Sequence, residues 1–363
     1  MSGFGQFLRA RARKMLDIAS GISTPLIFSD RQREHMATRE RAGLFDFSFM
    51  CCVDVAGPQA VEFLHALQTR SLFGLRAGRI AYELILRDDG SVLNDATVWR
   101  LDHATWRVFV GRRSDFTHLE ETAEKYDVQL HDVSRAHAVI ALQGPASRSI
   151  IERCFGKNVA ALPYYAFAQS PCDAGRCAIA RIGYSGEFGF EIVADDASAA
   201  LLWQRLLAAG IDGRIVECGF EATDSLRIEA GHILFMRELA SPVQPRELGL
   251  GRLVDLHAHD FRGACALRAR PALTRRLCGL LPATDCEPTD RLPRRIRDGA
   301  AVMTSVTYSP VLERPVGIGF VNPDDAYPGT RVELDGGGIA RVARLPFYDP
   351  AKILSRGPRR AIN

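Results

Sequence analysis

The sequence has little of several features that mark other classes of protein. No apolar run reaches about 18 residues, the length that a membrane-spanning helix needs. The net charge of the 363-residue chain is only +3, so its electrostatics give no reason to expect a nucleic acid as partner. Its nine cysteines include no Cys-x-x-Cys pair, and no spacing of His, Cys and Asp fits a metal site. We therefore expect no membrane span, no nucleic-acid partner and no bound metal.

Further absences narrow the chemistry and the location. Lysine occurs only at Lys14, Lys125, Lys157 and Lys352, which leaves few candidates for Schiff-base chemistry. No Gly-x-Gly-x-x-Gly sequence is present, so we expect no flavin-binding domain on this chain. Residues 1–16 are basic but lack the continuous apolar segment of a secretory signal, which predicts a cytoplasmic protein. A first surface helix and an Arg-rich transit peptide are the two interpretations of this segment.

Length and composition predict more than one domain. With 363 residues, of which 47% are apolar, the chain exceeds one ordinary hydrophobic core. Two stretches, 53–110 and 139–193, share one order of expected elements: a strand, a Gly-Pro turn, a helix and further strands. This weak repeat predicts two related halves, about 1–135 and 136–267, within one domain over 1–267.

The rest of the chain differs in composition. Residues 268–297 are rich in Arg, Pro and Thr and are expected to form a linker. Beyond them, 298–363 holds short runs of strand-forming residues separated by Gly and Pro turns, which is typical of a small antiparallel barrel. The predicted fold class is α+β, with two related α/β halves around a pocket and a C-terminal antiparallel β-barrel.

The stretch 182–192, IGYSGEFGFEI, is the most informative part of the sequence. Its glycines permit a turn that places Tyr184 and Glu191 on the same side. The residues around Glu191 alternate as in a strand that leaves a hairpin. Two carboxylate oxygens there fit a pair of N–H donors, from a guanidinium or from the aminopyrimidine edge of a pterin. At this point an exposed strand glutamate explains the pattern equally well.

Together with TDSLRIEAG at 223–231, this stretch resembles the folate-binding fold shared by the glycine cleavage T-protein (aminomethyltransferase), the folate-binding parts of dimethylglycine and sarcosine oxidoreductases, and folate-dependent demethylases. The resemblance covers nearly the whole chain, and the order and spacing of the matching segments make it specific. The other matching segments are LFDFSFM at 44–50, VAGPQAVEFL at 55–64, LRAGRIAYELILRDDGSVLNDATV at 75–98, ALQGP at 141–145, PRELGLG at 245–251, DFRG at 260–263, MTSVTYSPVL at 303–312 and LPFYDP at 345–350.

The resemblance implies a tetrahydrofolate-dependent one-carbon transferase. In such an enzyme, N5 of tetrahydrofolate accepts a methylene or methyl group from a small methylated or aminomethyl donor, which a flavoprotein or a carrier protein could deliver. The aminomethyltransferase T-protein of the glycine cleavage system is the alternative within the family. A folate-binding assembly or repair factor without turnover is the alternative of another class, and the KGCxxGQE-like signature of such factors is absent here.

For catalysis, the resemblance implies an aspartate near the N5 and N10 atoms of folate, and Asp95 matches that position. Asp95 follows a hairpin in an apolar strand, where burial would make its charge state matter. The T-protein has two adjacent aspartates where this chain has Asn94 and Asp95, so the assignment is open by one residue. An aspartate that satisfies local backbone groups in a turn is the structural alternative.

Five residues are expected to bind tetrahydrofolate: Glu191, Tyr184, Arg227, Tyr82 and Met50. The glutamate would accept hydrogen bonds from the pterin edge, and the tyrosines would flank the flat rings, where aromatic area gives affinity. Without the resemblance, the arginine would pair with Asp224 or Glu229 on its own helix. The tyrosines and the methionine would then be ordinary core residues.

The donor side departs from the T-protein pattern. Phe49 stands where the T-protein has a histidine, Arg252 stands where it has a tryptophan, and Arg112 lies in a segment that replaces an asparagine-rich strand end. The candidate substrate residues are Arg112, Arg252 and Asn94. Arginines there favour an anionic small donor over the long neutral aminomethyl-lipoyl arm. If the arginines lie on the outer surface, the donor is unchanged.

Overall fold

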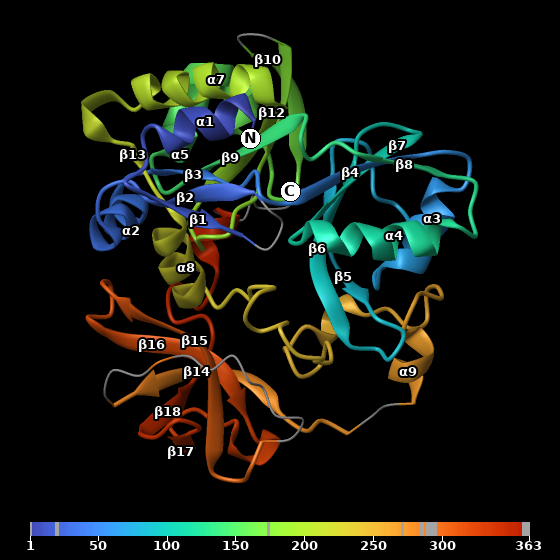
Figure 1. Cartoon of the computed structure of the whole chain (residues 1–363), viewed down its shortest axis with the longest axis vertical. Helices are drawn as coiled ribbons and strands as arrows, with labels where there is room; N and C mark the ends of the chain where they lie inside the picture. Colours follow the sequence, from blue (N-terminus) through green and yellow to red (C-terminus); the bar gives the residue numbers. More distant parts are fainter. Residues whose placement is uncertain are drawn as a thin grey trace, which may run out of the picture.

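The structure is a computed structural model that describes residues 2–18, 22–172, 175–269, 272–283, 287 and 296–357. Three regions are visible in Figure 1: a sheet with helices at the upper left, a second sheet with helices at the right, and a barrel at the bottom. Within the described ranges, no helix combines the length and the apolar character needed to cross a membrane.

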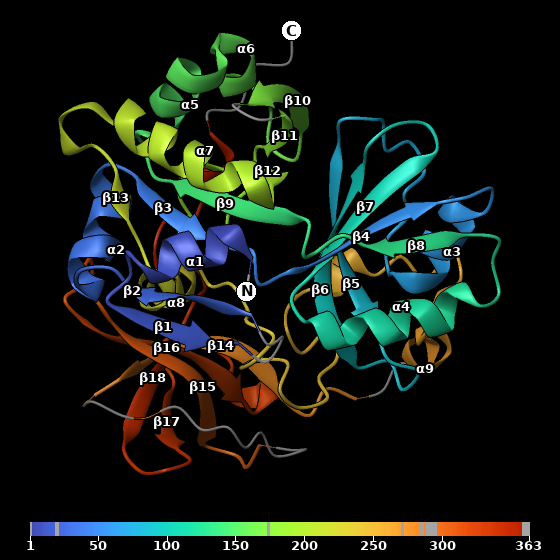
Figure 2. The same cartoon turned by 45° about the horizontal axis from the view of Figure 1, so that its top comes forward.

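One sheet has the strand order β5-β6-β7-β4-β8, built from strands that follow one another along the chain. Its elements are β4 (Cys51–Ala56), α3 (Ala60–Leu67), β5 (Ile80–Leu86), β6 (Val92–Arg100), β7 (Thr105–Val110), η1 (Arg113–Asp115), α4 (Phe116–Ala123) and β8 (Gln129–Asp132). The turn between β5 and β6 has Gly90 at φ +77°, as the Asp-Gly pair predicts. Phe63 of α3 and Leu119 of α4 pack with Val53 of the sheet, so both helices cover the same face (Figure 2).

The other sheet has the order β10-β11-β12-β9-β3-β13. Its elements are β3 (Gly43–Asp46), β9 (His137–Gln143), α5 (Ser147–Phe155), α6 (Lys157–Ala160), β10 (Phe167–Cys172), β11 (Gly175–Ala180), β12 (Gly189–Asp195), α7 (Asp196–Ala209), η2 (Ile211–Gly213) and β13 (Val216–Glu217). The chain starts with α1 (Gly3–Arg9), in which Phe4 lies 5.7 Å, ring to ring, from Trp203 of α7. The helix interpretation of the basic N-terminal segment therefore holds for these residues.

The two halves of the first domain do not meet at the position that the sequence repeat predicts. β3 belongs to the first half of the sequence, yet it pairs with β9 from Gly43↔Gln143 to Asp46↔Ile140. All four residues of β3 are buried, and a strand buried on both faces needs a place inside a sheet. The predicted boundary between 135 and 136 is therefore wrong. β3 comes from the first half of the sequence but lies in the second sheet, and α1, also from the first half, packs on α7.

Smaller elements join these sheets. β1 (Lys14–Asp17) and β2 (Ser23–Ile27) form a two-stranded sheet, and α2 (Arg31–Glu40) packs on α8 (Phe220–Glu229). A hydrophobic core lies between the two large sheets and includes Leu84, Trp99 and Ala180. The partly buried side chains at the rim of this core include Met50, Tyr82, Tyr165 and Tyr184.

The C-terminal region is a closed barrel in the order β14-β16-β15-β17-β18. Its strands are β14 (Arg276–Pro282), β15 (Ala300–Ser309), β16 (Arg314–Val321), β17 (Arg331–Leu334) and β18 (Ile339–Ala343), and the remaining short helices are η3 (Gly251–Leu253), α9 (Ala264–Arg268), η4 (Pro323–Asp325) and α10 (Ile353–Arg356). β17 runs parallel to β15, so the barrel is not wholly antiparallel. β14 lies within 268–297, so the barrel begins inside the predicted linker. The predicted fold class, two α/β halves and a barrel, is otherwise confirmed.

Candidate functional site

Tyr82 and Asp95 come from neighbouring strands and meet at the rim of the central core. Strand β5 pairs with β6 so that Leu84 lies opposite Asp95, which places Asp95 diagonally from Tyr82 on the same face. The Tyr82 hydroxyl donates a hydrogen bond of 2.8 Å to Oδ2 of Asp95. Burial raises the pKa of Asp95, and this hydrogen bond opposes the rise. The Tyr82 hydroxyl thus fixes the orientation of the Asp95 carboxylate in a poorly hydrated environment.

Asn94, the other candidate for the catalytic position, points the opposite way. Successive residues of a strand face opposite sides, and Asn94 is fully buried beneath the sheet. Its Nδ2 donates a hydrogen bond of 2.6 Å to Oδ2 of Asp115, at the start of α4. Only Asp95 shares a face with Tyr82.

Glu191 lies in β12 between Ala141 of β9 and Ala180 of β11, on the face that meets the central core. Its side chain is 9% exposed, and no hydrogen bond or ion pair reaches its carboxylate from the residues that the structure describes. Burial raises its pKa to about 7. An unpaired buried carboxylate costs free energy unless a ligand supplies the donors, so this position fits a binding site.

Three tyrosines, Tyr82, Tyr165 and Tyr184, lie at the rim of the central core that Glu191 faces. Burial raises the pKa of Tyr82 well above its ordinary value, and the charges of Asp95, Tyr165 and Tyr184 add to the rise. Burial likewise raises the pKa of Tyr165, with contributions from its neighbour in sequence and from Glu191. The three tyrosines all pack against the central core. The predicted residue Met50 lies at the rim of the same core.

Arg227 sits in a different environment from the other predicted cofactor residues. Its guanidinium is 0% exposed and donates hydrogen bonds to Asp224 at 2.8 Å, to Glu238 at 2.9 Å and to Ser305 at 2.7 Å. Of the two ion pairs weighed from the sequence, the one with Asp224 forms, while Glu229 pairs with Arg39 instead. A role of Arg227 as a folate ligand stays a prediction, and the structure shows that its donors are engaged.

The predicted substrate arginines differ in their surroundings. Arg112 donates a hydrogen bond of 2.9 Å to the carbonyl of Leu93, and its Nε lies 3.5 Å from Oδ2 of Asp115. Its guanidinium lies over the Phe235 ring, 5.8 Å from the ring centroid. Arg252 is exposed in η3, with no ion pair to another described residue. Phe49 is 7% exposed and packs in the central core.

The family is settled by both domains of the chain. The family model for the GCVT N-terminal domain matches residues 6–258, and the model for the glycine cleavage T-protein C-terminal barrel domain matches residues 275–349. The chain belongs to the glycine cleavage T-protein family. The predicted class, an enzyme of folate-dependent one-carbon transfer, is thereby confirmed.

Proteins and structures of the T-protein family match the chain over almost its full length. The aminomethyltransferase of Streptomyces coelicolor is 36% identical over 95% of this chain and 96% of its own length. The aminomethyltransferase of Geobacillus kaustophilus is also 36% identical, over 92% of this chain and 94% of its own. The crystal structure of glycine cleavage system aminomethyltransferase T from Bartonella henselae superposes with a TM-score of 0.80 at 29% identity, covering 95% of this chain and 96% of the other.

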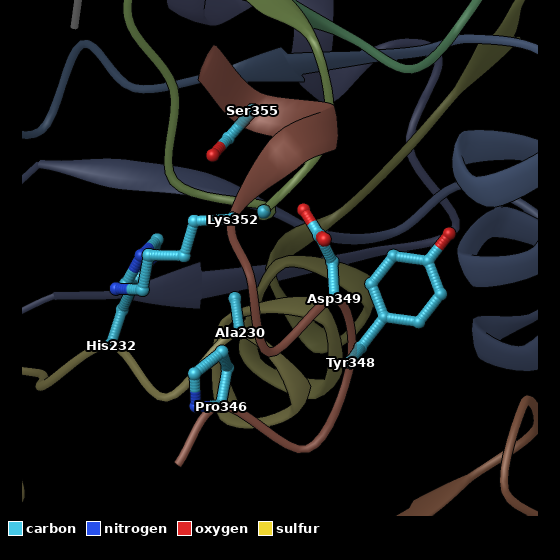
Figure 3. Close-up of a pocket in the computed structure, with 8 residues that line it drawn as sticks. Ala230, His232, Pro346, Tyr348, Asp349, Lys352 and Ser355 are labelled. Carbon is cyan, nitrogen blue, oxygen red and sulfur yellow. The ribbon is translucent and has the colours of Figure 1, made fainter. Parts of the chain in front are cut away.

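A small pocket adjoins the tyrosine side of this T-protein site (Figure 3). His232 lines it and stacks on Tyr184 with ring centroids 5.4 Å apart, while its Nδ1 donates to the carbonyl of Tyr184. Burial lowers the pKa of His232 to about 4, so the ring is neutral at pH 7. Lys352, from the segment after the barrel, enters the pocket beside His232. The histidine therefore has a structural part in fixing Tyr184.

Sequence reasoning missed one residue of the candidate site, Tyr165, and one residue buried beneath it, Glu83. Tyr165 has a left-handed backbone with φ +58° and a ring centroid 4.4 Å from that of Tyr164. It lies in a loop without periodicity, so only the adjacent tyrosines after Pro163 hinted at it. Glu83 is fully buried, although its place in an alternating strand gave no sign of burial.

Proposed function

We propose that this chain is an aminomethyltransferase, which moves a one-carbon group from an aminomethyl donor onto tetrahydrofolate. Membership of the T-protein family in both domains supports this proposal, as do the relatives named aminomethyltransferase. The single observation that carries it is Glu191, a buried carboxylate without a partner among the described residues, on the face of β12 that borders the central core.

The residues around Glu191 fit tetrahydrofolate. The aminopyrimidine edge of its pterin offers adjacent N–H donors, and a carboxylate is the acceptor that matches them. Glu191 supplies that acceptor, and Tyr82, Tyr165 and Tyr184 supply aromatic surface at the rim of the same core. When bound, tetrahydrofolate supplies the nucleophilic nitrogen that accepts the carbon.

Asp95 is the residue that we assign to the transfer itself. The hydrogen bond from Tyr82 fixes the direction of its carboxylate, so the charge does not have to reorganise during the reaction. A fixed negative charge stabilises the positive charge that develops on the transferred carbon and its nitrogen as the donor bond breaks. Asn94 has no such placement, because it is bound to Asp115 beneath the sheet.

We assign the donor to the alternative within the family, an aminomethyl group on the lipoyl arm of a carrier protein. In this reaction the carbon–sulfur and carbon–nitrogen bonds of the aminomethyl group would break, and the carbon would become bonded to N5 and N10 of tetrahydrofolate. The protons lost from N5 and N10 would go to the leaving sulfur and nitrogen, which gives the lipoyl thiol and ammonia. The hypothesis of an anionic small donor rested on Arg112 and Arg252; Arg112 is engaged by Leu93 and Asp115, and Arg252 is exposed in η3. Arg113 is likewise paired with Asp132.

The test is a turnover assay with aminomethylated lipoyl carrier protein and tetrahydrofolate, in which ammonia and methylene-tetrahydrofolate are measured together. The proposal predicts that both products appear in equal amounts. Dimethylglycine, sarcosine and a methoxy acid serve as comparison donors. Turnover with one of these and none with the carrier would replace the proposed donor by a small carboxylated one. Absence of tetrahydrofolate binding in calorimetry would overturn the proposal as a whole.

A further inference from the structure

Tyr82 on β5 and Asp95 on β6, the two residues of the candidate site on these strands, each have a polar neighbour in sequence that faces the opposite side of the sheet. Tyr82 is followed by Glu83, and Asp95 is preceded by Asn94. Glu83 and Asn94 lie diagonally across the two strands, because Glu83 pairs with Ala96. They point into the core beneath helices α3 and α4, away from the pocket.

Glu83 is the most isolated carboxylate among the described residues. It is 0% exposed, and neither of its carboxyl oxygens has a hydrogen-bond partner within the described ranges. Its apolar neighbours on the same face of the two strands include Ala81, Ile85 and Ala96. Oδ1 of Asn94 is also without a partner there. Burial raises the pKa of Glu83 to about 8, and only the positive charge of Arg70 opposes the rise.

The other polar groups around this core are engaged elsewhere. At the start of α4, Asp115 accepts from Asn94 and lies 3.5 Å from Arg112. On α3, His65 accepts a hydrogen bond of 3.0 Å from the backbone N–H of Leu72. No cation that the structure describes forms an ion pair with Glu83, so at pH 7 the side chain is a neutral carboxylic acid.

The position of β5 makes it the element that a charge on Glu83 would displace. β5 is an edge strand, so β6 is its only neighbour in the sheet. On its other side, beside Glu83, a bridge between Gln68 and Ile85 and a hydrogen bond from Thr69 to Leu84 hold it, and a hydrogen bond from the Ile80 N–H to the Tyr165 carbonyl holds its first residue. An ionised Glu83 would be drawn toward water and Arg70. The next residue back along the strand is Tyr82, whose hydroxyl directs Asp95.

We propose that Glu83 is a positioning residue that must stay protonated, because its ionisation shifts β5, removes the Tyr82 hydroxyl from Asp95, and stops one-carbon transfer at alkaline pH. The inference rests on the proposed role of Asp95 in transfer. Glu83 binds its proton more tightly in the folded chain than in the unfolded chain. Its contribution to stability is therefore full below an ordinary pKa of 4.5 and is lost as pH rises through about 8.

The test compares the wild-type chain with Glu83→Gln, which has the same shape and cannot ionise. The turnover number at saturating tetrahydrofolate and the thermal midpoint are both measured between about pH 6 and pH 9.5. In the wild type we expect turnover to fall about tenfold per pH unit above the midpoint, as for one ionising group. In Glu83→Gln we expect turnover at alkaline pH to stay within about twofold of its neutral value.

The outcomes separate positioning from a purely structural role. If the thermal midpoint of Glu83→Gln becomes independent of alkaline pH while its turnover still falls like the wild type, the positioning proposal is overturned. It is equally overturned if neither profile changes. Hydrogen exchange of the β5 amides, corrected for intrinsic rates and compared with β12, needs no donor and no variant. Loss of protection confined to β5 above about pH 8 supports the proposal even if the proposed donor is wrong, and uniform protection contradicts it.

Discussion

The buried carboxylates around α8 and those on the facing strands differ in their partners. Glu229 accepts hydrogen bonds from Arg39 at 2.7 Å and from Ser309 of the barrel, and Glu238 accepts from Arg227 at 2.9 Å and from Thr304 at 2.7 Å. On the strands, Glu191 and Glu83 have no partner among the described residues. The first group is paired with buried arginines, and the second is not.

The pKa shifts follow the same division. Burial acts to raise the pKa of Glu229, but His35, whose Nε2 lies 3.2 Å from the carboxylate, and the charge of Arg39 outweigh it and lower the pKa. Burial alone raises the pKa of Glu191 to about 7. The α8 network joins the first domain to the barrel through satisfied charges, so it is structural. Of the strand carboxylates, Glu191 is unsatisfied at the proposed ligand site, while Glu83 is unsatisfied in the core on the opposite face of its sheet.

The largest effect should come from breaking the satisfied network. Arg227→Met would leave Glu238 buried without its cation, and we expect a loss of about 3–5 kcal/mol in the free energy of unfolding in urea. The matched control is Arg297→Ala, which removes an exposed pair with Glu333 and should cost at most about 1 kcal/mol. Equal losses in the two variants would show that the α8 network does not hold the fold.

Removal of charge at the pocket should affect turnover without affecting the fold. Asp95→Asn keeps the shape, so we expect tetrahydrofolate affinity near that of the wild type and a fall in the turnover number of about 100- to 1000-fold. Asn94→Ala is the control, and it should lower stability more than turnover because its hydrogen bond to Asp115 is lost. An active Asp95→Asn together with an inactive Asn94→Ala would move the catalytic position to Asn94.

Glu191 should control binding. Glu191→Gln turns an acceptor oxygen into a donor amide that faces ring N–H groups, and we expect calorimetry to show about 1–3 kcal/mol weaker binding of tetrahydrofolate. The required carboxylate is lost as pH falls through about 7, so wild-type affinity should decline toward acid pH. This decline should be absent in the variant.

Glu187→Gln is the matched control for this experiment. The same change of charge occurs on the hairpin four residues earlier in the chain, at a carboxylate that pairs with Arg39 at 2.9 Å. It should reduce stability and leave folate affinity within about twofold. If Glu187→Gln weakens folate binding as much as Glu191→Gln does, the difference between paired and unpaired carboxylates has no functional meaning.

The smallest effect is expected at Tyr184. Its hydroxyl donates to the carbonyl of Ile233, and its ring stacks on His232. Tyr184→Phe keeps the ring and loses one hydrogen bond, so we expect about 0.5–1.5 kcal/mol lower stability and little change in folate affinity. A much larger loss of affinity, measured by calorimetry, would indicate that the hydroxyl itself contacts the ligand.

Local patterns predicted the elements of the pocket well. The alternation around the Asp89-Gly90 turn predicted β5 and β6, and the glycines of 182–192 predicted the hairpin that carries Glu191. What the sequence alone did not reveal depends on distant residues. The pairing of β3 with β9 joins segments about a hundred residues apart, and the partner of Arg227 in the barrel is Ser305.

The sequence pattern also failed to predict the burial of one side chain and the presence of one strand. Glu83 is the one charged residue in AYELIL, and its charge gave no sign of burial, yet it lies on a face that packs with residues of α3. The sequence did not reveal β14 within an Arg- and Pro-rich stretch, because the four apolar residues of LCGLLP are too few to stand out there.

The most direct test of the central claim is a crystal structure of the chain with tetrahydrofolate bound. We predict the pterin edge within hydrogen-bond distance of Glu191, about 2.7–3.2 Å, with the tyrosine rings beside it and Asp95 next to the nitrogen that accepts the carbon. Tetrahydrofolate bound elsewhere, with the carboxylate of Glu191 still unpaired, would contradict the claim that the ligand is the missing partner of this carboxylate.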